Sequence, residues 1–144
     1  MSGIENIRFD ESIALVNSDE RRDIYDPERI LNGIERRWYH HSVIVINQQN
    51  LKLGNHFHDY QEVFFTPTGG FYFTFVDRDN VKNSATFELI RGSRILIPEN
   101  MPHVVVGKEN SVLLGYGNVQ FDPKRLIIPD ESVLEALSKN SRKF

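Results

Sequence analysis

The sequence predicts an all-β fold, and two observations carry this prediction. Short runs rich in β-branched and aromatic residues recur along the chain, and turn residues separate them at intervals of roughly 8–12 residues, as in a β-sandwich or barrel. The length of 144 residues also suffices for one domain with a real hydrophobic core. We therefore expect a single all-β domain over residues 1–144.

The composition of each run places the strands. Pro67 to Gly70 reads as a turn between two aromatic runs that pair as a hairpin. In the second run Phe71, Phe73 and Phe75 share one face, which we assign to the core, with a dimer interface as the alternative. The predicted strands are, in order, 13–16, 41–46, 60–66, 71–76, 85–90, 94–97, 103–106 and 112–120.

The two ends of the chain differ from this pattern. One or two helical turns are expected over Pro27–Ile34. In the tail an apolar stripe predicts a short helix over Val133–Leu137, and Ser132 and Glu135 have the spacing of a capping box. An N-terminal arm, the barrel core and a C-terminal extension are therefore expected at residues 1–39, 40–121 and 122–144.

Composition and charge exclude several classes of protein. The chain has no cysteine, so disulfides and thiolate metal sites are excluded. The net charge of −3, with signs interspersed, gives no footprint for nucleic acid. No apolar run approaches the ~20 residues of a membrane span, and the N-terminus lacks the apolar region of a signal peptide. These features predict a cytoplasmic protein with no nucleic-acid or membrane partner.

A cluster of metal-ligating residue types stands out in the middle of the chain. His56, His58 and Glu62 all have even numbers, so a single strand would project all three from one face. His103, 45 residues after His58, follows a short apolar run and a Pro-bounded turn. Three imidazoles and one carboxylate suit a divalent metal ion. Zn, Fe, Mn, Ni and Co all accept this set, and the alternative is a polar cluster without metal.

The same residues resemble the two motifs of the cupins, a family of small β-barrels. The first motif, His-x-His, three residues, Glu, six residues, Gly, is met from His56 to Gly69. The second, Gly, five residues, Pro-x-Gly-x-x-His, is met from Gly92 to His103, except that Asn100 replaces the usual Gly. Asn also tolerates left-handed backbone angles. The resemblance implies a cupin double-stranded β-helix, or jelly-roll barrel, and fills all four metal-ligand positions of the family.

A narrower resemblance links the chain to nucleotide-sugar cupins of surface-polysaccharide biosynthesis. Three segments carry it: Asp19-Glu-Arg-Arg22, in which Arg22 replaces the usual Gly, Leu53-Gly-Asn-His-Phe-His58, and Phe121-Asp-Pro123. Those cupins include ketoisomerases and epimerases of deoxyhexose nucleotides, several of which act without metal and use a histidine as general base. The resemblance implies a sugar or nucleotide sugar as substrate.

The leading hypothesis is a metal-dependent sugar isomerase or epimerase. The metal would polarise a carbonyl while a base removes the adjacent C–H proton. We assign Glu62 as ligand and possible base, and Tyr72 or Tyr116 as candidate proton donor. The alternatives are a metal-dependent dioxygenase of a small molecule and a non-catalytic sugar-binding or sensor cupin.

Assembly and phosphate binding give two further expectations. A homodimer is predicted, because the segment 63–65 is apolar on both sides and needs cover on both. Arginines near the barrel mouth could pair with a diphosphate, although each is also compatible with a solvated surface charge. The candidates are Arg21, Arg22, Arg36 and Arg37. For His40 and His41 we favour a surface or strand-edge position, the alternative being a place at the pocket mouth.

Overall fold

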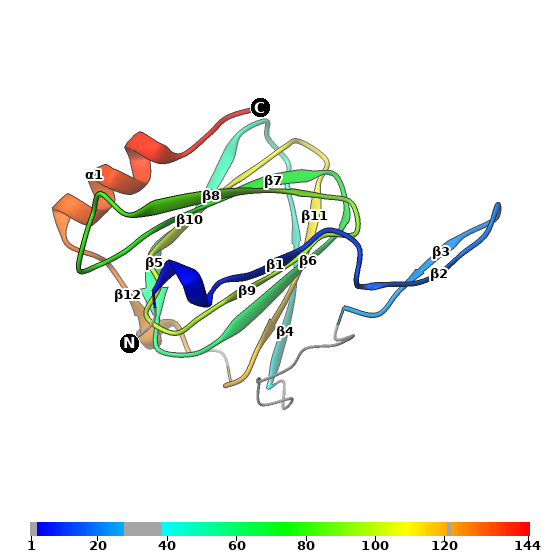
Figure 1. Ribbon diagram of the computed structural model, residues 1–144, viewed down its shortest axis with the longest axis horizontal. Helices are drawn as coiled ribbons and strands as arrows, with labels where there is room; N and C mark the ends of the chain where they lie inside the picture. The colour runs from blue at the N-terminus through cyan, green and yellow to red at the C-terminus, as the bar shows by residue number, and fades with distance from the viewer. Residues whose placement is uncertain (1–2, 28–38, 121) are drawn as a thin grey trace.

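A computed structural model describes residues 3–27, 39–120 and 122–144 of the chain. Two five-stranded antiparallel sheets face each other in it (Figure 1). The first has the order β1 (Arg8–Asp10), β9 (Arg94–Ile97), β6 (Glu62–Thr68), β11 (Val112–Gly117), β4 (His40–Val45). The second has the order β12 (Leu126–Ile127), β5 (Leu51–His58), β10 (His103–Gly107), β7 (Gly70–Val76), β8 (Ser84–Ile90).

Consecutive strands from β4 to β11 pass back and forth between the two sheets, β7 and β8 alone being neighbours in one sheet. This is the predicted jelly-roll barrel. The turn predicted over residues 67–70 is shorter than expected. Strand β6 ends at Thr68 and β7 begins at Gly70, so that only Gly69, with a φ of 90°, lies between them. The helical turns predicted after Pro27 lie outside the described residues, as does Phe121.

The core between the sheets is aromatic, as predicted. Phe71, Phe73 and Phe75 on β7 are each 0% exposed, and burying a side chain of this size stabilises a fold by about 1.5–3 kcal/mol. On the other face of β7 the Tyr72 ring stacks on Phe144, with the ring centroids 4.4 Å apart. The alternation of strand side chains therefore separates the core from the tail of the chain.

A bulge in β5 changes which side chains of this strand face inward. Gly54 and Asn55 have φ angles of 93° and 59°, and Asn55 has no partner on β10, where Val104 lies opposite Gly54 and His103 opposite His56. One extra residue in one strand is the definition of a β-bulge. Before it Leu51 and Leu53, at odd positions, pack against the core, whereas after it the even-numbered His56 and His58 face inward.

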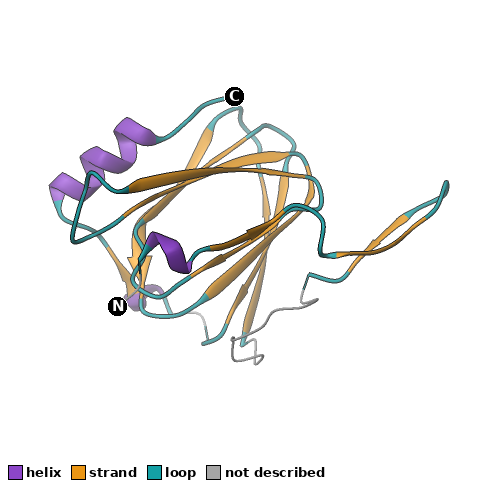
Figure 2. Ribbon diagram, viewed as in Figure 1, coloured by secondary structure: helices purple, strands orange, loops and turns teal. Residues whose placement is uncertain are grey.

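One helix, α1 (Glu131–Asn140), covers the outside of the second sheet. Figure 2 shows this helix in purple beside the strands. Its Val133 and Leu137 are buried against Val76 and Val104. The helix begins before the predicted Ser132, at the N-cap Asp130, and no side chain caps it, so the capping-box prediction was wrong. Two short 3-10 helices, Ile4–Asn6 and Pro123–Arg125, complete the helical elements of the described residues.

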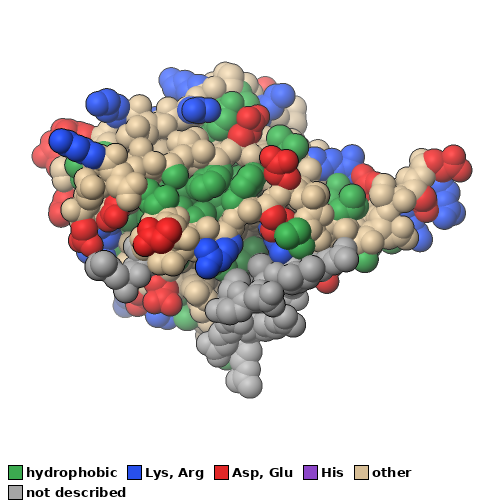
Figure 3. Space-filling view, viewed as in Figure 1, with side chains coloured by type: hydrophobic (Ala, Val, Ile, Leu, Met, Phe, Trp, Pro, Cys, Tyr) green, Lys and Arg blue, Asp and Glu red, His purple; other side chains and the backbone are tan. Residues whose placement is uncertain are grey.

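The N-terminal arm forms a hairpin of β2 (Leu15–Ser18) and β3 (Asp23–Tyr25), which extends away from the barrel (Figure 1). Charged side chains crowd its tip (Figure 3). At its base the Tyr25 ring lies 5.3 Å from that of Phe65. None of the described helices is long and apolar enough to span a membrane.

Candidate active site

A cavity of about 490 Å³ lies between the two sheets, and its lining is divided in character. Ionisable and hydrogen-bonding side chains that contact one another form the polar cluster, namely His40, His56, His58, Tyr60, Glu62 and His103. The apolar wall consists of Ile44, Leu53, Phe64, Val105, Leu113 and Leu126. Cavities of this size and mixed lining are typical of small-molecule sites.

The first motif reaches the cavity from two strands, not one. His56 and His58 lie on β5 in the second sheet, whereas Glu62 begins β6 in the first sheet, so the prediction of a single strand was wrong. Residues 59–61 turn the chain between the sheets. The three side chains still converge, because both strands present these positions to the space between the sheets.

Three of the four predicted metal ligands come together. The imidazoles of His56, His58 and His103 offer ligand atoms that all lie within 4.8 Å of one another. His103 reaches the others because it lies directly opposite His56 in the β5–β10 ladder. Glu62 is not a member of this group of three.

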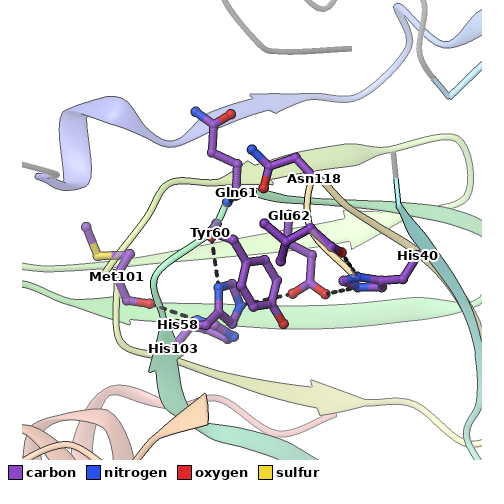
Figure 4. Close-up of polar contacts among 9 residues, drawn as sticks. His40, His58, Tyr60, Gln61, Glu62, Met101, His103 and Asn118 are labelled. Carbon is purple, nitrogen blue, oxygen red and sulfur yellow. Dashed lines mark hydrogen bonds and ion pairs between the residues drawn. The ribbon is translucent and has the colours of Figure 1, made fainter. Parts of the chain in front are cut away.

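Main-chain carbonyls fix the tautomers of two of these histidines (Figure 4). Nδ1 of His58 lies 2.9 Å from the carbonyl oxygen of Tyr60, and Nδ1 of His103 lies 2.8 Å from that of Met101. A carbonyl oxygen only accepts hydrogen bonds, so each Nδ1 carries a proton. Nε2 is therefore the atom that each ring offers to the other groups of the site.

Glu62 bridges two imidazoles (Figure 4). Its Oε1 lies 3.1 Å from Nε2 of His58, and its Oε2 lies 3.6 Å from Nε2 of His40. Burial favours a raised pKa for Glu62, but the hydrogen bonds to His40 and His58 outweigh it and lower the pKa to about 2. Glu62 is therefore a carboxylate, and His58 can donate to it from Nε2 while donating to Tyr60 from Nδ1.

His40 is a member of the site that sequence reasoning placed at the surface or strand edge. Its Nδ1 donates to the carbonyl oxygen of Val119 at 2.7 Å, which aims Nε2 at Glu62. Hydrogen bonding to Glu62 raises the pKa of His40 against the effect of its partial burial. A signal was present in the sequence, because His40 has the same parity as Ile44, and both face the cavity from β4.

Tyr60 is the tyrosine that lines the cavity. Its ring stacks on His58 with the centroids 4.1 Å apart, and burial together with the charge of Glu62 raises its pKa to about 12. Of the tyrosines predicted as proton donors, Tyr72 stacks on Phe144 outside the core, and Tyr116 packs against Val63 and Leu96 on the other side of its sheet. Neither lines the cavity.

Two imidazoles of the polar cluster are neutral at ordinary pH. Burial, reinforced by the electrostatic effect of the neighbouring His58, lowers the pKa of His103 to about 3. The same two causes, in the same order, lower the pKa of His56. These rings therefore offer lone pairs to a proton or to a metal ion.

The donor set can be tested against the metal predicted from the sequence. Three imidazoles whose ligand atoms lie close together fit a divalent ion, because three-histidine sites with open positions are common for zinc and related metals. The fit is incomplete for the fourth ligand, since Glu62 faces His58 and His40. A four-residue ligand set therefore stays a prediction.

The arginines predicted for a diphosphate do not line the cavity in the described part of the chain. Arg21 pairs with Asp19 at 3.2 Å in the projecting hairpin, where Arg22 is also exposed. Arg36 and Arg37 lie outside the described residues. A different arginine lies beside the site: Arg125 pairs with Asp59 at 2.8 Å, and its guanidinium carbon lies 5.7 Å from the ring centroid of Tyr60.

The sequence matches no protein-family model and no curated protein. Among solved structures it is similar to a 3,4-ketoisomerase from Helicobacter canadensis, with 16% identity, a TM-score of 0.73, and 91% of this chain and 97% of that chain covered. A sugar 3,4-ketoisomerase from Thermoanaerobacterium thermosaccharolyticum in complex with TDP is similar with 15% identity and a TM-score of 0.74, and 95% of this chain and 98% of that chain are covered. A TDP-quinovose 3,4-ketoisomerase from Campylobacter jejuni is similar with 19% identity and a TM-score of 0.71, and 92% of this chain and 99% of that chain are covered.

A dTDP-4-dehydrorhamnose 3,5-epimerase from Elizabethkingia anophelis is also similar, with 13% identity, a TM-score of 0.68, and 88% of this chain and 76% of that chain covered. At these identities the likeness shows the fold. The chain thus has the cupin fold that sugar-nucleotide ketoisomerases and epimerases share, as the resemblance of its motifs implied.

Proposed function

We propose that the chain is an isomerase or epimerase that acts on a keto sugar carried by a nucleotide. The observation that carries the proposal is the polar cluster itself. It places neutral imidazoles, an imidazole–carboxylate pair and a protonated phenol around one cavity. The shared fold of the ketoisomerases and epimerases supports the same reaction class.

Isomerisation next to a carbonyl needs a base on the C–H bond and an acid on the carbonyl oxygen. His56 lines the cavity with a lowered pKa and serves as the base that takes the proton from carbon. The electron pair of that C–H bond forms the double bond of an enediol. Return of a proton to the former carbonyl carbon, with loss of the hydroxyl proton from the first carbon, gives the isomeric ketone. Return to the opposite face of the first carbon, with loss of the proton that the carbonyl oxygen had gained, gives the epimer. In either case the released hydroxyl proton restores the acid.

His58, hydrogen-bonded to the Glu62 carboxylate, supplies the proton for the carbonyl oxygen. Glu62 stabilises the charged ring until the transfer. Tyr60 stays protonated because its pKa is raised to about 12, so its hydroxyl is a hydrogen-bond donor for the oxygen of the enediol. In this assignment Tyr60 takes the role that the sequence gave to Tyr72 or Tyr116.

A metal ion is the alternative to this acid–base assignment. His56, His58 and His103 would hold it, in place of their roles as base and acid, and it would supply Lewis-acid polarisation of the substrate carbonyl. Zn, Fe, Mn, Ni and Co remain candidates, because imidazole ligands suit all of them.

Arg125 is the described cation that we assign to the diphosphate of the substrate. Its side chain is 37% exposed, and the next residue in the chain is Leu126 of the apolar wall. A guanidinium binds phosphate bidentately. When the substrate binds, Arg125 can release Asp59 and pair with the diphosphate, so its charge stays paired. Arg125→Ala should therefore raise KM for the nucleotide sugar more than it lowers kcat.

The direct test is proton exchange in D₂O. TDP-4-keto-6-deoxyglucose, which one of the similar ketoisomerases binds in its solved structure, is the first substrate to try, with NMR detection of ring protons. We expect solvent deuterium at a carbon next to the keto group and the appearance of an isomer. His58→Asn is the matched control and should lose both signals. Absence of exchange with any keto-sugar nucleotide, together with intact folding, would contradict the proposal.

We also infer a homodimer, but on a surface different from the one expected. Val63, Phe64 and Phe65 are already buried within one chain, so they create no need for a partner. The edge strand β4 instead exposes Val43 by 69% and Val45 by 54%. Sedimentation of the wild type and of a Val43→Glu variant tests this, and a wild type of 16.8 kDa at micromolar concentration would contradict it.

A further inference from the structure

Ser42 borders the cavity but belongs to neither the polar cluster nor the apolar wall. It lies on β4 between His40 and Ile44, which border the same cavity. The Ser42 hydroxyl makes no hydrogen bond with another residue in the described part of the chain. His41 also borders the cavity, but its ring packs edge-on against Tyr116. Ser42 therefore places a hydroxyl that is available to a ligand beside the apolar wall.

The Ser42 hydroxyl reaches inward across a glycine of the next strand. Ser42, Gly115 and Phe64 lie in one row of the β4–β11–β6 ladder. A Cβ at position 115 would lie 2.5 Å from Oγ of Ser42 and 2.8 Å from Cε1 of Phe64. Glycine inside a strand permits this close approach of neighbouring groups. The hydroxyl thus lies over the inner face of the sheet and points away from the sheet edge that β4 forms.

The next row of the same ladder belongs to the polar cluster. His40 and Glu62 lie there on either side of Gly117, two residues along their strands from Ser42 and Phe64. Two residues of a strand span about 6.6–6.8 Å, which is comparable to the breadth of a sugar ring with its substituents. A ring whose reacting carbon lies at the polar cluster therefore has a neighbouring substituent within reach of Ser42.

The chemistry of the keto sugar indicates which substituent this is. In TDP-4-keto-6-deoxyglucose, the substrate chosen above, C4 bears the keto group and the C3 hydroxyl becomes the new carbonyl on isomerisation. C1 carries the diphosphate and C5 carries a methyl group. The C2 hydroxyl is the ring hydroxyl that the reaction leaves unused. Beside an apolar wall it needs a partner, because a buried hydroxyl without a hydrogen bond costs binding free energy.

We propose that Ser42 is a specificity-determining residue, which hydrogen-bonds a hydroxyl on the carbon beside the enediol of the substrate. The inference rests on the proposed function, since it takes the polar cluster as the place of reaction. It narrows the substrate class to keto sugars that keep this hydroxyl and turn C–H or methyl groups toward the apolar wall.

The test is a double-mutant cycle between the full-length protein and its substrate. Kd and kcat/KM are measured for TDP-4-keto-6-deoxyglucose and for its analogue with hydrogen in place of the C2 hydroxyl. The wild type should bind the analogue about 10-fold more weakly and turn it over with about 10-fold lower kcat/KM, because one neutral hydrogen bond is lost. Ser42→Ala should lose about as much on the hydroxylated sugar and should treat the two nucleotides alike.

A second pair of variants separates the hydroxyl from the shape of the side chain. Ser42→Thr and Ser42→Val have nearly the same shape, so they share any steric effect, but the threonine alone keeps a hydroxyl. Ser42→Thr should therefore retain the preference for the hydroxylated sugar, and Ser42→Val should lose it. Ser138→Ala, the same substitution at an exposed position of α1, is the matched control and should behave as the wild type.

The outcomes distinguish this inference from the proposed function. A wild type that binds the hydroxylated sugar more tightly, loses this preference in Ser42→Ala and exchanges no proton would support the role of Ser42 and contradict the isomerase. Turnover with the same preference in the wild type, Ser42→Ala and Ser42→Val would overturn the role of Ser42 and leave the isomerase. A wild type without a preference would also overturn the role of Ser42, and one that binds neither nucleotide would overturn both.

Discussion

The polar cluster and the apolar wall share one cavity but are held in place by different means. In the polar cluster His40, His58 and His103 each give their Nδ1 proton to a main-chain carbonyl, so the direction of these three rings is set by a hydrogen bond. In the apolar wall Leu53 and Leu113 are placed by packing against the phenylalanine core. Hydrogen bonds specify atoms, whereas packing specifies volume.

This difference predicts two kinds of sensitivity. Substitutions in the polar cluster should change chemistry first, because each removes one atom-specific role, and their effect on folding should depend on pH. Substitutions in the apolar wall should change stability and leave the reaction largely intact, because a neighbouring side chain can fill part of the lost volume.

The largest effect on turnover should come from His58. His58→Asn removes the ring that pairs with Glu62 and stacks on Tyr60. Loss of a general acid lowers rates by about 10²–10⁴-fold. We expect a fall in kcat of about 10³-fold for the keto-sugar nucleotide, with circular dichroism unchanged. A kcat within 5-fold or so of the wild type would remove His58 from the mechanism.

Acid should destabilise the protein through the polar cluster. The pKa of Glu62 is lowered from 4.5 to about 2, and that of His103 from 6.5 to about 3. Both shifts are downward, so both contributions are complete at neutral pH and are lost as pH falls, from about 6.5 for His103 and from about 4.5 for Glu62. For Glu62 the shift corresponds to about 3 kcal/mol.

Urea unfolding at pH 7, 5 and 4 measures this loss. The raised pKa of His40 acts in the opposite sense, since its contribution is present below pH 6.5 and fades as pH rises through the raised value. Glu62→Gln should flatten the decline between pH 5 and 4, whereas a wall variant such as Leu113→Ala should run parallel to the wild type. If the stability of Glu62→Gln fell with pH in parallel with that of the wild type, the Glu62 carboxylate would not be the cause of the acid sensitivity.

Leu113→Ala should lower stability and leave kcat nearly unchanged, the reverse of what we expect for His58→Asn. Leu113 is 1% exposed and belongs to the core cluster. Truncating a buried leucine costs about 2–5 kcal/mol, and we expect about 2 because one side of Leu113 already borders the cavity. The thermal midpoint should drop while kcat stays within a few-fold. A kcat loss as large as that of His58→Asn would show that the wall also positions reacting atoms.

Gly54→Ala should give the smallest effect of these variants, and it should change both stability and the binding of metal by the polar cluster. Gly54 has a φ of 93°, and a Cβ there would lie 2.9 Å from the carbonyl oxygen of His103. Strain of this kind costs about 1–3 kcal/mol, and we expect about 1–2. Because His103 must shift, the affinity for Co²⁺ should fall as well. Unchanged stability and unchanged cobalt binding would show that the bulge relaxes without cost.

The sequence predicted the barrel and most of its strands because turn residues and β-branched runs are local signals. Arg94–Ile97 was predicted with the bounds that the structure has. The positive φ of Asn100, 58°, also agrees with its reading as a substitute for glycine in the second motif. Spacing along the chain therefore sufficed where the determining interactions are short in range.

The partners of the site residues could not be predicted, because they come from distant strands. Glu62 meets His40 only because β6 and β4 both flank β11 in the first sheet. The parity argument for His56, His58 and Glu62 also assumed one continuous strand, and the turn at 59–61 breaks it. Tyr60 was missed although the predicted strand 60–66 gave it the same parity as Glu62, because the search was directed at metal ligands.

The bulge at Gly54 and Asn55 is a place where a related chain could be one residue shorter without changing the rest of the barrel. Residues on either side of Asn55 keep their inward positions only because the unpaired Asn55 drops out of the ladder. A chain one residue shorter at this point would align its ladder in the same way and keep Leu53 and His56 on the inner face. Two segments that flank this position are therefore best aligned as separate blocks, with a one-residue gap allowed between them.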